Sequence, residues 1–324
     1  MQEFIIQTSE NGLTLEKYVF KVLPVAPLSF IYKLFRKKDI KVNGHHEDKK
    51  FRLTTNDIVA IYINDEQIKE FQKEKALNPN LRIKDWIIYE DENVLFVNKP
   101  SGLLVQKSAP QDESLDQLVI EYLMATNQYN PDKEKGFVPG PAHRLDRNTS
   151  GIVVFGKNHE TLTMLFDLFK DHDLINKHYL ALVVGNVEKD KDIITAPLKK
   201  DEKNNKVVVS KDGKSAQTVY KVLKRFNGYT LLDVTLLTGR THQIRVHMSY
   251  TNHPIVGDAK YGNFAVNKEF KDKYHFNTQF LHAYKIGFGE LEYPLNSLSK
   301  KEFVAEPREE IANILTMLEN IIEE

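Results

Sequence analysis

A polar stretch divides the sequence into two parts with different patterns. Residues 65–85 are rich in Lys, Glu, Gln and Asn, contain Asn-Pro-Asn and lack a sustained apolar period. Such a segment is typical of a linker, because it offers no apolar face to a core. At about 150 residues per domain, a chain of 324 residues has room for roughly two domains. We therefore expect a small domain over residues 1–65, a linker over 66–85 and a larger domain over 86–324.

The first part predicts two helices followed by a small sheet. Apolar residues repeat at helical spacing over 15–23 and again over 28–35, where Tyr32 belongs to the apolar stripe. Asn43-Gly44 predicts a tight turn, and residues 58–63 predict a strand. Residues 13–64 carry ten Lys and Arg against five Asp and Glu. This excess could bind a phosphate backbone, but an ordinary solvated face fits the charge alone equally well.

Composition narrows the possible classes of protein. The chain has 45 basic and 45 acidic residues, so net charge indicates neither a nucleic acid nor a membrane as partner. It has no cysteine, which excludes disulfides, iron–sulfur clusters, thiolate metal sites and cysteine nucleophiles. The start lacks a basic segment before an apolar run, and no stretch approaches 18 apolar residues. We expect a soluble, cytoplasmic protein.

From residue 86 onward, strand and helix patterns alternate. Residues 179–184 are apolar throughout, which suits a central strand covered on both faces. A helix is predicted after residue 158, with Leu162, Leu165, Phe166 and Phe169 as its apolar residues. Further strands are predicted at 87–89, 94–97, 152–155 and 219–237, the last range turning at Asn227-Gly228, and a final helix follows Pro307. We expect an α+β domain with a mixed, mostly antiparallel sheet.

Residues 141–151 form the densest polar loop. Asp146, Asn148 and Ser150 begin like a calcium-binding loop, but the position that needs a bidentate Glu is Lys157. A serine-nucleophile turn requires Gly two residues before Ser150, where Asn148 stands. Two interpretations remain open: a structural turn in which Asp146 caps backbone N–H groups, or an active-site loop that presents the Asp146 carboxylate.

Residues 238–250 hold a second polar segment, where a strand gives way to a helix. A zinc site is not indicated, because the spacing of His242, His247 and His253 matches no known arrangement of zinc ligands. Arg240 and Arg245 are well placed to bind a carboxylate or a phosphate. A surface ion pair is the alternative for both arginines. For Tyr179, at the start of the apolar strand, the alternative to a site role is packing in the core.

Several motifs together resemble, in order and approximate spacing, those of the RluA-type pseudouridine synthases. The motifs are His143-Arg-Leu-Asp146 with Thr149-Ser-Gly151, Lys177-His-Tyr179, Thr238-Gly-Arg-Thr-His-Gln-Ile-Arg-Val-His247, Gly257-Asp-Ala-Lys-Tyr-Gly262 and Leu281-His-Ala. This resemblance covers residue 86 to about residue 304. Residues 13–63 separately resemble the ribosomal-S4-like RNA-binding domain. Gln106 departs from the pattern, because a histidine is usual there.

The resemblance implies an enzyme that isomerises uridine in RNA. Uracil is detached from C1′, rotated and rejoined through C5, and no metal or cofactor is required. Asp146 would be the nucleophile, and Arg245 would keep it ionised because an adjacent guanidinium stabilises the charged form. Tyr179 would help to remove the C5 proton or would stack on the uracil. Since a tyrosine has a reference pKa of about 10, stacking is the better supported role.

The resemblance also implies how RNA is bound. The target base must be flipped out of folded RNA, and Arg144 would fill the vacated position with its planar guanidinium. Further RNA-binding candidates are His143, Arg240 and His242 in the large domain and Lys33, Arg36, Lys37, Lys38 and Lys41 in the small one. The N-terminal motifs resemble branches that act on large-subunit ribosomal RNA, with transfer RNA as the alternative, and we expect a monomer. Two other functions stay open: an RNA-binding protein without chemistry, and a hydrolase with Asp146 as base.

Overall fold

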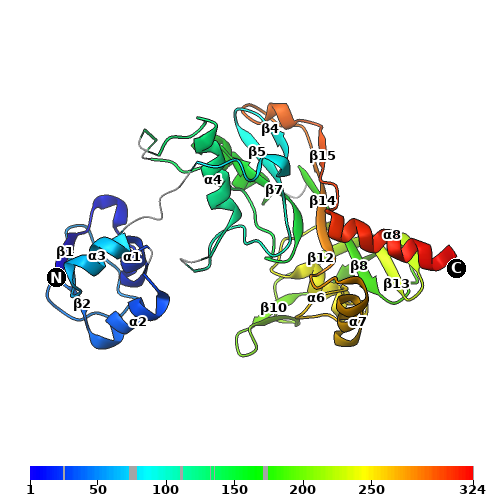
Figure 1. Cartoon of the computed structure of the whole chain (residues 1–324), viewed down its shortest axis with the longest axis horizontal. Helices are drawn as coiled ribbons and strands as arrows, with labels where there is room; N and C mark the ends of the chain where they lie inside the picture. Colours follow the sequence, from blue (N-terminus) through cyan, green and yellow to red (C-terminus); the bar gives the residue numbers. More distant parts are fainter. Residues whose placement is uncertain are drawn as a thin grey trace. The chain divides into compact units, whose positions relative to one another are not determined.

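The computed structural model describes residues 1–24, 26–72, 79–109, 112–131, 133–134, 136–170 and 174–323, which form two compact units (Figure 1). The first comprises Met1–Pro79 with Lys107–Glu113, and the second comprises Asn80–Gln106 with Ser114–Glu324. Each unit has a hydrophobic core of its own. Within the described ranges, no helix is both long enough and apolar enough to cross a bilayer.

The N-terminal unit packs its helices on an antiparallel sheet of order β1-β3-β2. The strands are β1 (Gln2–Ile5), β2 (Ile40–Val42) and β3 (Ile58–Ile61), and the helices are α1 (Leu15–Val22), α2 (Leu28–Lys37) and α3 (Asp65–Gln72). Thr14 begins α1, because its hydroxyl accepts a hydrogen bond from Lys17 N. The predicted turn forms at Asn43 and Gly44, whose φ angles of 49° and 82° suit these two residue types.

Two predictions for this unit are wrong. Tyr32 is 43% exposed, because the buried face of α2 is carried by Ile31 and Leu34 instead. Residues 65–72, expected to begin the linker, form α3, and Ile68 and Phe71 pack that helix on the core. Two apolar residues three positions apart lie on the same face of a helix. A pair of this kind is too short to be recognised as a helical repeat in the sequence. Residues 73–78 of the expected linker lie outside the described residues.

The second unit is built on one large sheet. In its described part, ten strands join in the order β4-β5-β7-β14-β8-β13-β12-β9, with β15 paired to β14 and β6 paired to β7. The strands are β4 (Ile87–Glu90), β5 (Val94–Lys99), β6 (Gly140–Pro141), β7 (Ser150–Gly156), β8 (Ile175–Val184), β9 (Lys191–Thr195), β12 (Gln217–Phe226), β13 (Tyr229–Leu236), β14 (Leu281–Phe288) and β15 (Glu302–Val304). A separate hairpin joins β10 (Leu198–Asp201) to β11 (Lys206–Val209). Only β7 and β14 pair in parallel among the described strands, so the predicted α+β fold with a mixed, mostly antiparallel sheet is confirmed.

Helices cover both faces of this sheet. They are α4 (Leu115–Ala125), α5 (His159–Leu168), α6 (Gln243–Tyr250), α7 (Phe264–Tyr274) and α8 (Glu309–Glu323). Side chains alternate along β5, so Leu95 shares a core with α4, whereas Phe96 shares the opposite core with α5. The terminal helix α8, red in Figure 1, is the predicted final helix, and its Ile311 and Ile314 belong to the main core of this unit.

The sheet order brings together the segments that the sequence singled out. As predicted, β8 is central: it lies between β14 and β13 and is buried from both faces. β14 also pairs with β7, with His282 opposite Ser150. The polar loop before β7 therefore ends with only β14 between it and β8. The helix α6 follows β13, the other neighbour of β8. Residues far apart in the chain therefore meet around the start of β8.

Candidate active site

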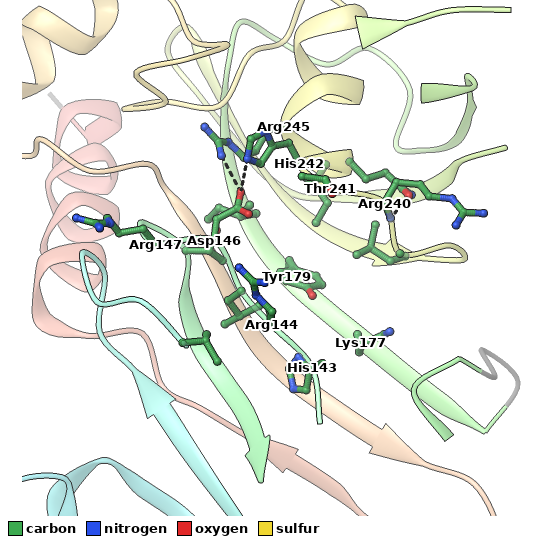
Figure 2. Close-up of a pocket in the computed structure, with 18 of the residues that line it drawn as sticks. His143, Arg144, Asp146, Arg147, Lys177, Tyr179, Arg240, Thr241, His242 and Arg245 are labelled. Atoms are coloured by element: carbon green, nitrogen blue, oxygen red, sulfur yellow. Dashed lines mark hydrogen bonds and ion pairs between the residues drawn. The ribbon is translucent and has the colours of Figure 1, made fainter. Parts of the chain in front are cut away.

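A pocket of about 790 Å³ opens in the second unit, where the loop before β7, the start of β8 and the start of α6 meet (Figure 2). Every site residue predicted for this domain lines it: His143, Arg144, Asp146, Tyr179, Arg240, His242 and Arg245. The sheet topology, rather than proximity in sequence, creates this cluster.

Arg245, in the first turn of α6, joins two carboxylates. Its Nη1 donates to Asp146 Oδ2 at 2.7 Å, while Nε and Nη2 donate to Asp258 at 2.7 and 2.9 Å (Figure 2 shows the contact with Asp146). The side chains of Arg245 and Asp258 are 10% and 1% exposed, so these charge-assisted bonds form in a low dielectric. Burial lowers the pKa of Arg245, but Asp258 and then Asp146 outweigh burial and raise it. The guanidinium is therefore a permanent cation of fixed orientation.

Asp146 presents its carboxylate to Arg245 and to the pocket. In the described part of the chain, no backbone N–H donates to this carboxylate, so the interpretation of a self-capped turn is wrong. The turn is closed by the backbone instead, since Thr149 N donates to the Asp146 carbonyl at 3.1 Å. The Asp146 side chain is 29% exposed, which leaves it accessible from the pocket.

Lys99, the last residue of β5, supports this loop from behind. It is fully buried, and its Nζ donates to three carbonyl oxygens at 2.9, 2.8 and 3.0 Å, those of Pro100, Leu103 and Arg147. Burial lowers the pKa of Lys99 to about 7, and the nearby charge of Asp146 opposes that change. Lys99 was not among the predicted site residues, although a lysine at the end of a buried strand and directly before Pro-Ser-Gly was a usable signal.

The far end of the loop is fixed against β14. Gly151 has a φ of +112°, and a Cβ there would lie 2.2 Å from the carbonyl oxygen of Ala283, so only glycine fits. Ser150 Oγ lies 2.9 Å from His282 Nδ1, and His282 Nε2 lies 2.9 Å from the carbonyl oxygen of Ala305. Because Nε2 must donate to that carbonyl, Nδ1 accepts from Ser150. Burial lowers the pKa of His282 to about 4, which keeps this bridge neutral.

Tyr179 lies in the core and also lines the pocket. Its ring packs in the same apolar cluster as Leu145 and Ala283, so the core-packing interpretation is correct for the ring. Burial, and then the charge of Asp146, raise the pKa of Tyr179 well above its usual value of 10. The hydroxyl therefore stays protonated at neutral pH, so it can donate a hydrogen bond but is unsuited to accept a proton as a phenolate.

Asp258 and Tyr261 are site residues that the sequence analysis missed, although both belong to the quoted motif Gly257–Gly262. Asp258 accepts from the backbone N–H groups of Lys260 and Tyr261 at 2.8 and 3.1 Å. Burial would raise the pKa of Asp258, but Arg245 and these backbone donors hold it below its usual range. The Tyr261 ring centre lies 5.1 Å from the Arg245 guanidinium carbon, so it covers that cation.

His242 lies beside Asp146 at the start of α6. Its φ of 55° places it in the left-handed region, and its Nδ1 lies 2.8 Å from the Tyr261 hydroxyl. Its Nε2 is 3.8 Å from Asp146 Oδ2. Burial lowers the pKa of His242, although Asp146 opposes this.

The other predicted residues of this domain differ in their freedom to contact RNA. His143 Nε2 accepts from Val154 N at 3.2 Å, and its ring stacks on Phe169 with centres 4.3 Å apart. Burial and the charge of Lys177 lower the pKa of His143 to about 3, so it is a neutral, internally bonded group. Arg144 is exposed, and so is Arg240, whose Nε donates to the Ser215 carbonyl at 3.0 Å.

The predicted residues of the N-terminal unit lie on its own surface. Lys33, Arg36 and Lys37 are exposed on α2, and Lys38 is exposed directly after it. Lys41, on β2, is half-buried with its Nζ 5.1 Å from the centre of the Tyr62 ring. In the second unit, the atypical Gln106 is exposed and is not part of the pocket lining, whereas its neighbours Leu104 and Val105 are.

The pocket combines one accessible carboxylate, a buried guanidinium, a tyrosine face and exposed cations. Among the described residues, no group of three or more His, Cys, Asp or Glu side chains is arranged to hold a metal ion. The arrangement can keep a nucleophile ionised beside a flat apolar surface in cationic surroundings. Such a site suits a planar base attached to a polyanion.

Comparisons with known proteins agree with this chemistry. Residues 93–250 match the family model for RNA pseudouridylate synthases. The chain is 33% identical over 320 residues to an uncharacterized RNA pseudouridine synthase of Mycoplasma capricolum, covering 95% of this chain and 98% of that protein. It is 34% identical over 279 residues to ribosomal large subunit pseudouridine synthase C of Vibrio vulnificus, covering 86% of this chain and 85% of that protein. Against synthase D of Borreliella burgdorferi, identity is 37% over 316 residues, covering 94% and 89%.

The fold defines the class of protein. The structure of human RNA pseudouridylate synthase domain containing 4 aligns with a TM-score of 0.58 at 23% identity, covering 74% of this chain and 94% of that one. The fold is thus that of the pseudouridylate synthases. The chain belongs to the RNA pseudouridylate synthase family, and the expected resemblance to its RluA-type members is confirmed.

Proposed function

We propose that this protein converts one or more uridines of large-subunit ribosomal RNA to pseudouridine. The observation that carries the chemistry is the Asp146 carboxylate, bound at 2.7 Å by Arg245 yet open to the pocket. Two relatives that match most of the chain are named for the large ribosomal subunit, which supports this RNA as substrate.

In the proposed reaction, Asp146 attacks the nucleotide at its ribose or its base. The bond between C1′ and uracil breaks, the uracil rotates, and C5 bonds to C1′. C5 loses its proton and N1, freed from C1′, takes up a proton, so the product is an isomer of uridine and the Asp146 carboxylate is released unchanged. Arg245 stabilises the carboxylate, and Tyr179 supplies a stacking face with a donating hydroxyl at its edge.

RNA binding divides between the two units in this proposal. Arg144, exposed beside Asp146, fills the position that the flipped uridine leaves. The N-terminal unit acts as an S4-like domain that binds phosphates through the exposed lysines and arginine of α2. In this proposal the enzyme works as a monomer in the cytoplasm.

Pseudouridine mapping in total RNA from a deletion strain tests this function. We expect sites in large-subunit ribosomal RNA to lose pseudouridine and to regain it with the wild-type gene but not with Asp146→Asn. Sites lost in transfer RNA would instead assign that substrate. If the deletion strain kept every pseudouridine, the proposed function would be contradicted. Release of tritium from C5-labelled uridine in RNA would distinguish an enzyme from an RNA-binding protein without chemistry.

A further inference from the structure

One end of the pocket is lined by side chains that the proposed chemistry does not use. Phe166 lies in the last turn of α5, Phe169 and Lys170 directly follow that helix, and Lys177 comes from the start of β8. Phe166 is one of the apolar residues of the predicted helix, yet it is 45% exposed. The core positions of α5 are taken by Leu165 and Leu168, so the Phe166 ring is left at the pocket.

Lys177 is a partly desolvated cation that faces the pocket (Figure 2). Its Nζ lies 5.4 Å from the centre of the Phe169 ring, and no carboxylate among the described residues lies within ion-pair distance of it. Burial lowers the pKa of Lys177 to about 8. A cation held over a ring recovers only part of its lost hydration, so an anion in the pocket would complete its surroundings.

The two phenylalanines have different environments. Phe169 is covered by His143, which stacks at 4.3 Å with an interplanar angle of 15°. Phe166, three residues earlier and in the last turn of α5, is exposed. His143 is neutral, and Lys170 is paired with Asp167 at 2.7 Å. Lys177 is therefore the cation held next to the Phe169 ring.

We propose that this end of the pocket is a second nucleotide subsite. The base next to the target uridine stacks on Phe166, and the phosphate that links the two nucleotides binds Lys177. Single-stranded nucleic acids are bound in this way, by aromatic faces for bases and cations for the backbone. The inference rests on the proposed function only in taking RNA as the ligand.

Binding of a fluorescent 12-nucleotide oligouridylate, measured by anisotropy at several salt concentrations, tests the subsite without requiring turnover. Lys177→Met should reduce the slope of log K against log salt by about 0.7, the value for one lost single-strand phosphate contact, and Lys177→Arg should preserve it. Phe166→Ala should weaken binding about fivefold or more at an unchanged slope, and Phe166→Tyr should retain affinity. The matched controls are Phe264→Ala and Lys273→Met, which remove exposed side chains of α7 outside the pocket.

Equal affinities and slopes in wild type, Phe166→Ala and Lys177→Met would overturn the subsite, as would the absence of wild-type binding. A Lys177→Met protein that is less stable but keeps the wild-type salt slope would show that Lys177 only stabilises the fold, through its contact with Phe169 after α5. If the oligomer shows the expected effects while no cellular RNA loses pseudouridine in the deletion strain, the proposed function fails and the subsite stands.

Discussion

Asp258 binds two nitrogens of the Arg245 guanidinium, at 2.7 and 2.9 Å, and thereby directs the remaining nitrogen, Nη1, to Asp146. Asp258 is not part of the pocket lining, yet the orientation of the pair inside the pocket depends on it. The site is therefore a chain of three charges in which only one end is accessible to substrate.

This chain predicts that Asp258→Asn lowers the maximal rate at least tenfold, because a neutral amide holds Arg245 less firmly. Removing one charge of a buried pair should also cost about 3–5 kcal/mol of stability. Tritium release at saturating RNA, below the unfolding temperature of the variant, measures the first effect. Asp201→Asn, at the end of β10 and outside the pocket lining, is the control. An unchanged maximal rate in folded Asp258→Asn would show that Arg245 needs no positioning.

For Asp146→Asn we expect no isomerisation, with RNA affinity within a few-fold of wild type. The amide keeps the shape of the side chain but is not a nucleophile. Tritium release and filter binding on the same preparation measure both quantities. Turnover above background in the purified variant would remove Asp146 from the reaction.

Tyr179→Phe separates stacking from proton transfer. The ring remains, and burial already raises the pKa of the native phenol, so we expect glycosidic cleavage to persist with a modest loss of rate. Product analysis by mass spectrometry distinguishes the two roles. Accumulation of an unreleased adduct would show instead that the hydroxyl is needed to remove the C5 proton.

Removal of residues 1–79 should leave a folded enzyme, because the second unit has its own core from Ile83 onward and Asn80 bonds to Glu121. This boundary replaces the one expected at residue 65, which would cut off α3 from its core. We expect the RNA concentration for half-maximal rate to rise and the salt slope to fall by about 0.7–0.9 for each lost phosphate contact. An unchanged slope would mean that Lys33, Arg36 and Lys37 do not contact RNA.

The buried His282 predicts a dependence of stability on pH. In the folded protein its pKa is about 4, whereas an unfolded histidine titrates near 6.5. Between these values the unfolded chain binds a proton that the folded chain excludes, so stability falls as pH decreases from about 6.5 to 4. The slope should be about 1.4 kcal/mol per pH unit for this group. Urea unfolding of wild type and His282→Gln should show a smaller slope in the variant, with exposed His45→Gln as the control.

Local sequence patterns were sufficient to predict most of the helices and strands. The apolar run at 179–184 became the central part of β8, and the repeat at 15–23 became α1. Sequence patterns gave the wrong burial where contacts with another segment of the chain decide whether a side chain is covered. Phe166 follows the apolar pattern of α5 but lies at the pocket. In the polar stretch 65–72, Ile68 and Phe71 pack a helix onto the core.

By itself, the sequence determined the family, the α+β class and the residues that share the pocket, because motif order and apolar periodicity are properties of the chain read locally. The tertiary structure alone decided what those residues do to one another. Asp146 and Arg245 are 99 positions apart, and no pattern states that Asp258 fixes Arg245, that Lys99 holds the loop, or that His143 is neutral. These properties arise from burial and from contacts across β7, β14 and β8, which exist only once the sheet has formed.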